Sequence, residues 1–140
     1  MEICTQFSGI ERTDGAWLVH TNCADIKIIF VTDEIVRVRT AFDKEFTEES
    51  YVLMTTAWED RLDPLFEMER TRVEPVIPGV EETDNEITFD TGKIRLVLMK
   101  NPIGFELYDT EGTLLYSDLH GNPLSLDSNR RVTHYSCMEE

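Results

Sequence analysis

Apolar and polar residues alternate with a period of two along much of the chain, most clearly in two segments of similar design. Asp25–Thr40 reads DIKIIFVTDEIVRVRT, and Lys93–Asp109 reads KIRLVLMKNPIGFELYD. Each segment is a run of β-branched and large apolar residues, then a polar turn, then a second run. Since successive side chains of a strand point to opposite faces, the pattern predicts two antiparallel β-hairpins with one buried face.

Shorter runs of strand-forming residues lie around these hairpins. Further strands are predicted at Ala16–Thr21, Tyr51–Met54, Glu86–Phe89, Thr113–Tyr116 and Arg131–Tyr135. Turn residues separate them, as at Asp90-Thr91-Gly92, Asp109–Gly112 and Asn122-Pro123. Roughly ten short strands with a turn signal about every 8–12 residues, and no helix of any length, predict an all-β fold, an antiparallel β-sandwich.

The middle of the chain has a different composition. Asp43–Glu69 holds nine acidic residues against two basic ones, which predicts loops with a helical turn at most near Trp58–Leu62. The dipeptide Asp63-Pro64 limits that turn, because proline disfavours helical geometry in the residue before it. Arg72–Val80 contains two prolines and is expected to be extended or an edge strand.

Size and charge narrow the function classes. The 140 residues suit a single domain, and 41% hydrophobic residues allow a packed core. The net charge of −15 argues against binding to nucleic acid or to an anionic membrane surface, since both require basic side chains. The start of the chain lacks the basic and apolar regions of a signal peptide, and no stretch is apolar enough for a membrane helix.

Three cysteines, Cys4, Cys23 and Cys137, are widely spaced. An odd number at such spacing does not indicate a disulfide framework or a zinc site. We therefore expect reduced thiols in a cytoplasmic protein.

No residue pattern predicts a catalytic or metal site. The three histidines, His20, His120 and His134, lack metal-ligand spacing and are expected to be surface or hydrogen-bonded residues, although a Cys–His nucleophile pair formed in space stays open. Adjacent acids such as Glu48-Glu49 are typical of solvated faces. A glycosidase needs two carboxylates about 5–10 Å apart across the bond that it cleaves. We predict no catalytic residue, no metal and no cofactor.

Trp58 is the one weak candidate for a carbohydrate contact, because it lies in an acidic, loop-like stretch where an indole can stack on a sugar. A core position at one end of the sandwich is the favoured interpretation for Trp58. The same holds for Tyr51, Phe66 and Tyr108.

Three segments carry a resemblance to a known family. Ile28–Thr40 resembles an early hairpin with the return strand D-x-I-x-R-V-R, and Thr91–Leu115 resembles the segment T-x-x-L-x-V-x-I-x-K-x-P-F-x-L-x-F-Y-D-x-x-G-x-x-L. Arg131–Glu140 resembles the stretch that leads into the following loop. In this order and spacing, they resemble the N-terminal β-sandwich of family 31 glycoside hydrolases, the α-glucosidase and α-xylosidase family. The resemblance begins near Ala24.

This resemblance implies a galactose mutarotase-like supersandwich over residues 1–140, as an excised N-terminal fragment of a longer retaining exo-α-glycosidase. It also implies two partners, the catalytic barrel of the parent chain and, through the parent, an α-linked oligosaccharide. In the family, the catalytic aspartates lie in a (β/α)₈ barrel with a W-x-D-M-N-type motif, which has no match here, so no catalytic residue is carried over. The expected role is a non-catalytic domain that supports the barrel and borders the sugar pocket.

Two other function classes stay open. One is an independent carbohydrate-binding or protein-interaction module, which would present an exposed aromatic platform. The other is an enzyme of mutarotase type, which requires a His–Glu pair that converges in a cleft. A fragment is also expected to self-associate, because it exposes apolar surface that the barrel would cover.

Overall fold

A computed structural model describes residues 1–13, 15–46, 55–56, 71–72, 75–121 and 123–137 of the chain. Within these ranges every regular element is a β-strand, which confirms the all-β prediction. The same ranges contain no helix of the length and apolarity that crossing a membrane requires.

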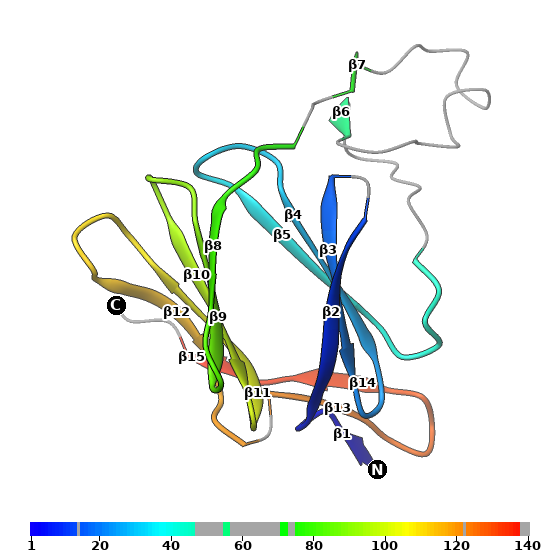
Figure 1. Ribbon diagram of the computed structural model, residues 1–140. Helices are drawn as coiled ribbons and strands as arrows, with labels where there is room; N and C mark the ends of the chain where they lie inside the picture. Colours follow the sequence, from blue (N-terminus) through cyan, green and yellow to red (C-terminus); the bar gives the residue numbers. More distant parts are fainter. Residues whose placement is uncertain (14, 47–54, 57–70, 73–74, 122, 138–140) are drawn as a thin grey trace.

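Two antiparallel sheets form the body of the domain, and they face each other across the core (Figure 1). The first has the order β2-β3-β4-β5. Its strands are β2 (Phe7–Thr13), β3 (Ala16–Thr21), β4 (Asp25–Phe30) and β5 (Val36–Ala41). The second has the order β15-β12-β11-β10-β9-β8. Its strands are β8 (Gly79–Glu82), β9 (Glu86–Asp90), β10 (Arg95–Lys100), β11 (Ile103–Tyr108), β12 (Leu114–Asp118) and β15 (Ser136–Cys137).

Two smaller sheets complete the described part. Strands β1 (Glu2–Ile3), β13 (Leu124–Leu126) and β14 (Val132–His134) pair in the order β1-β13-β14 and cross one end of the sandwich, near the N-terminus (Figure 1). Strands β6 (Thr55–Thr56) and β7 (Thr71–Arg72) form a parallel pair.

Aromatic side chains join the two main sheets. Trp17 of β3 and Phe30 of β4 come from the first sheet, and Phe89 of β9 comes from the second. The Phe89 ring centroid lies 5.4 Å from that of Trp17 and 5.7 Å from that of Phe30. Phe30 and Phe89 are fully buried. These three rings anchor the core that the period-two pattern predicts.

The two predicted hairpins are confirmed as β4–β5 and β10–β11. Strand β8 is the outer strand of the six-stranded sheet, so the edge strand expected within Arg72–Val80 is present but begins at Gly79. The sequence pattern did not predict β2, which is an edge strand of the four-stranded sheet. It also did not predict β1, β13 or β15. The strand predicted at Tyr51–Met54 lies outside the described residues.

Candidate functional site

An apolar cleft of about 360 Å³ opens between β5 and the strands β11–β14. Val36, Val38 and Thr40 of β5 line one wall, because alternate residues of this strand face inward. The opposite wall is mainly aliphatic and aromatic, with Phe105 and Leu107 of β11. An apolar cleft with a few convergent polar groups is a usual place to look for a binding site.

The polar groups of this cleft form one cluster, Tyr116, Asp118 and His134. The Tyr116 hydroxyl donates a hydrogen bond to Asp118 Oδ1 at 2.5 Å, and His134 Nε2 lies 2.7 Å from the same oxygen. His134 Nε2 is also 2.9 Å from the Tyr116 hydroxyl oxygen. Tyr116 and Asp118 are two residues apart on β12 and therefore share a face, while His134 comes from β14. The cluster thus links the six-stranded sheet to the three-stranded one.

Asp118 is the buried centre of this cluster, with a side chain only 6% exposed. Its second oxygen, Oδ2, accepts a hydrogen bond from the backbone N–H of Phe105 at 2.8 Å. A buried carboxylate is tolerated only when its oxygens are hydrogen-bonded, and here both are. Because a carboxylate only accepts, the geometry places a proton on His134 Nε2.

Tyr116 is a neutral donor in this cluster. Burial, followed by its hydrogen bond to Asp118, raises the pKa of the Tyr116 hydroxyl well above its ordinary value. In the unfolded chain the same group ionises at about pH 10.

This difference predicts a loss of stability at alkaline pH. Below about pH 10 the hydroxyl is protonated in both states, and its contribution to folding is fully present. As pH rises toward the higher pKa of the folded state, only the unfolded chain releases the proton, so the free energy of unfolding falls. We expect the urea midpoint to fall less steeply with rising pH in Tyr116→Phe than in the wild type. Equal slopes would show that this hydroxyl is not held neutral by the fold.

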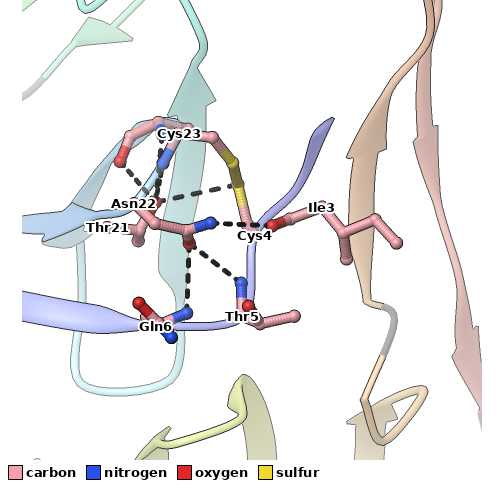
Figure 2. The surroundings of a disulfide bond; sticks show 8 residues. Ile3, Cys4, Thr5, Gln6, Thr21, Asn22 and Cys23 are labelled. Atoms are coloured by element: carbon pink, nitrogen blue, oxygen red, sulfur yellow. Dashed lines mark hydrogen bonds between the residues drawn. A yellow bond between two sulfur atoms is a disulfide. The ribbon is translucent and has the colours of Figure 1, made fainter. Parts of the chain in front are cut away.

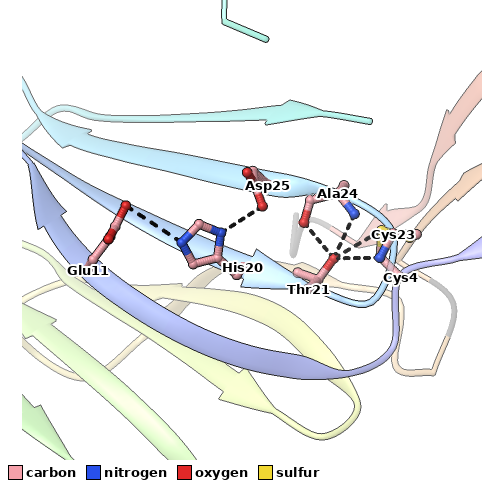
Figure 3. Close-up of polar contacts among 7 residues, drawn as sticks. All are labelled: Cys4, Glu11, His20, Thr21, Cys23, Ala24 and Asp25. Atoms are coloured by element: carbon pink, nitrogen blue, oxygen red, sulfur yellow. Dashed lines mark hydrogen bonds and ion pairs between the residues drawn. A yellow bond between two sulfur atoms is a disulfide. The ribbon is translucent and has the colours of Figure 1, made fainter. Parts of the chain in front are cut away.

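A second histidine cluster lies on the four-stranded sheet (Figure 3). His20 of β3 stands between Glu11 of β2 and Asp25 of β4, with Nδ1 at 2.8 Å from Asp25 Oδ1 and Nε2 at 3.7 Å from Glu11 Oε1. This arrangement confirms the expectation of a hydrogen-bonded histidine. His120 is exposed in the turn after β12. Among the residues that the structure describes, no three His, Cys, Asp or Glu side chains could hold a metal ion together.

The expectation of reduced thiols is wrong for two of the three cysteines, because Cys4 and Cys23 form a disulfide (Figure 2). Their Cα atoms are 5.7 Å apart. The side chain of Asn22 brings the two segments together, since its Oδ1 accepts from the N–H groups of Thr5 and Gln6 and its Nδ2 donates to the Ile3 carbonyl. Cys137 is a free, exposed thiol.

The Thr21 hydroxyl organises the turn that carries Cys23 (Figure 3). It donates to the Ala24 carbonyl at 2.7 Å and accepts from the N–H groups of Cys23 and Ala24. This local hydrogen bonding places Cys23 beside Cys4, which also lines the cleft.

The candidate carbohydrate contact Trp58 lies outside the described residues, as do Tyr51 and Phe66. The core position expected for Tyr108 is wrong, because this residue follows the core side chain Leu107 on β11 and faces outward. Sequence reasoning missed the Tyr116–Asp118–His134 cluster. The strand predicted at Thr113–Tyr116 ends before Asp118, so only the structure places Tyr116 and Asp118 on one face of β12.

A two-sheet antiparallel sandwich with an apolar cleft that is lined by a polar cluster is the class of domain that the geometry defines. Residues 25–138 match the family model described as the glycosyl hydrolase 31 N-terminal galactose mutarotase-like domain. The chain therefore belongs to this family, which confirms the resemblance seen in its sequence. No curated protein matches the chain.

Solved structures of the same kind share the fold. A dextranase of glycoside hydrolase family 31 from Flavobacterium johnsoniae, complexed with isomaltotriose, superposes with a TM-score of 0.69 at 17% identity over 91% of this chain. The cycloalternan-forming enzyme from Listeria monocytogenes, in complex with a pentasaccharide substrate, gives a TM-score of 0.60 at 14% identity over 87% of this chain. The chain spans 14% of the length of the first and 10% of the second.

Proposed function

We propose that this chain acts as the non-catalytic N-terminal domain of an α-glucosidase-type family 31 glycoside hydrolase, residues 1–140 forming one sandwich domain of the longer enzyme. In this role it supports the catalytic barrel and borders the pocket for an α-linked oligosaccharide. The observation that carries the proposal is the family match over residues 25–138.

The chemistry of the cleft agrees with a non-catalytic role. Hydrolysis of a glycosidic bond uses two carboxyl groups on opposite sides of the bond. Among the described residues that line the cleft, Asp118 is the one carboxylate, and Tyr116, His134 and a backbone N–H already occupy its oxygens. The mutarotase-type alternative requires a His–Glu pair in a cleft, whereas the partner of His134 here is this hydrogen-bonded aspartate.

Exposed apolar side chains supply surface for a neighbouring domain. They are Ile35, Val38, Ile77, Val80, Leu115, Leu119, Val132 and Tyr135. Exposed apolar area gathered in patches is typical of protein contact surfaces. In the proposed role the barrel covers part of this area. Self-association of the isolated chain stays a prediction, because these apolar side chains are exposed when the barrel is absent.

The cytoplasmic location also stays a prediction. Its argument from reduced thiols no longer holds, because disulfides such as Cys4–Cys23 persist mainly in oxidising compartments.

An activity assay tests the proposal directly. The 140-residue chain is expected to show no turnover of nitrophenyl α-glucoside above the buffer blank. Fusion of the chain to the catalytic barrel of its own enzyme is expected to raise both the activity and the thermal midpoint of the barrel. Turnover by the chain alone would contradict a non-catalytic role, and a barrel unaffected by the fusion would contradict a supporting one.

A further inference from the structure

The outer face of the six-stranded sheet is hollowed into a groove of about 650 Å³, on residues of β8–β11. The strand register explains the hollow. Glu81, Thr88, Val97 and Glu106 lie side by side in one row across the four strands, with the two short side chains in the middle and a glutamate at each end. The floor of the groove is therefore built from the short side chains of Thr88 and Val97, and its rim is long and polar.

Burial shows that this floor is enclosed. Val97 lies between the core residues Leu96 and Leu98 on β10 and points the opposite way from them. Its exposure is nonetheless only 7%. The surrounding side chains thus close around Val97, and the groove has walls.

An aromatic ring is held in the neighbouring row. Asp90, Arg95 and Tyr108 are cross-strand partners on β9, β10 and β11. The Arg95 guanidinium lies 5.1 Å from the centroid of the Tyr108 ring, and the Tyr108 hydroxyl donates to Glu106 Oε2 at 2.5 Å. Two contacts therefore fix the ring before any ligand arrives, which lowers the entropy lost on binding.

The charge of the groove restricts its ligand. Four carboxylates, those of Glu81, Glu86, Asp90 and Glu106, face a single cation, Arg95. Anionic ligands such as phosphates are repelled. In the described residues no group of three acids converges as a metal ion requires. Carboxylates accept hydrogen bonds from hydroxyl groups, and a tyrosine ring suits the C–H face of a pyranose.

We propose that this groove is a surface binding site for a neutral α-glucan segment, separate from the cleft. The choice of a glucan among neutral carbohydrates rests on the proposed function. Tyr108 supplies the stacking surface, the carboxylates of Glu81 and Glu106 accept hydroxyl protons at the two ends of the floor, and Arg95 donates to sugar oxygens.

Titration of the isotope-labelled 140-residue chain with isomaltotriose, followed by NMR, tests this site. We expect amide shifts concentrated in β8–β11. Tyr108→Ala is expected to weaken binding by about three- to tenfold, the range that an aromatic contact of ordinary strength supplies. Tyr135→Ala removes an exposed tyrosine outside the groove and is expected to leave the affinity unchanged. Since Tyr108 is not part of the core cluster, the circular dichroism spectrum of its variant should match the wild type.

Glu106→Gln provides a second variant of nearly the same shape, and weaker binding in this variant would support hydroxyl recognition by the carboxylate. Three results would overturn the site: no shift with isomaltotriose, shifts confined to the cleft, or an affinity that Tyr108→Ala leaves intact. Binding of glucose 6-phosphate as strong as that of isomaltotriose would also contradict it. None of these results bears on the activity assay above, so failure of the groove and failure of the proposed function can be distinguished.

Discussion

Replacing Phe89 by alanine is expected to lower the free energy of unfolding by about 3–5 kcal/mol. Phe89 is fully buried and is the ring through which the six-stranded sheet contacts Trp17 and Phe30 of the facing sheet. Its loss removes apolar burial and leaves a cavity between two sheets that are too rigid to close it. Since domains of this size are stable by only about 5–15 kcal/mol, the variant should lose a large part of its stability.

Urea unfolding followed by circular dichroism measures this loss, and Tyr135→Ala is its matched control. Tyr135 is 47% exposed, so removing its ring should change the free energy of unfolding by about 0.5 kcal/mol or less. A cost below about 1 kcal/mol for Phe89→Ala would contradict a core joined through these three rings.

The parts of this fold that could be predicted are those that local chemistry determines. Leu96 and Leu98 alternate with outward residues in β10, and both enter the core as period two requires. The turn before β10 is equally local. Asp90 Oδ1 accepts a hydrogen bond from the N–H of Gly92, which has a φ of +84°, a conformation that glycine adopts readily.

The strands that were missed depend on distant partners. Strand β2 reads FSGIERT, and it is an edge strand with largely exposed residues, so it lacks the strong alternation of β4 and β10. Strands β1 and β13 are each two or three residues long, and they pair with each other although they lie near opposite ends of the sequence. Propensity is too weak in such short segments to identify them, because the pairing itself makes them strands.

The cleft cluster was missed for a related reason. Asp118 lies beyond the end of the strand predicted at Thr113–Tyr116, and the third member, His134, reaches the other two only because the hairpin β13–β14 folds back beside β12. Spatial convergence of this kind leaves no motif in the sequence. The family resemblance, in contrast, could be recognised from the sequence, because it depends on long segments that follow one another in a fixed order. Trp58 stays an untested prediction as a carbohydrate contact.

Removing the Cys4–Cys23 disulfide is expected to lower the free energy of unfolding by about 3 kcal/mol. The bond closes a loop with a sequence separation of 19 residues, which restricts the unfolded chain and so favours folding. The double variant Cys4→Ala/Cys23→Ala and reduction of the wild type by dithiothreitol should lower the thermal midpoint by similar amounts. The hydrogen bonds of Asn22 to Ile3, Thr5 and Gln6 remain in both cases, so the fold should persist.

Two controls separate the disulfide from other thiol effects. Cys137→Ser changes only an exposed, unpaired thiol, so its thermal midpoint should equal that of the wild type and should still fall on reduction. The double variant should not respond to dithiothreitol at all. If reduction leaves the wild-type midpoint unchanged, the Cys4–Cys23 bond does not stabilise the fold. A fall in the midpoint on reduction would show that the bond between the N-terminal segment and the β3–β4 turn contributes to stability.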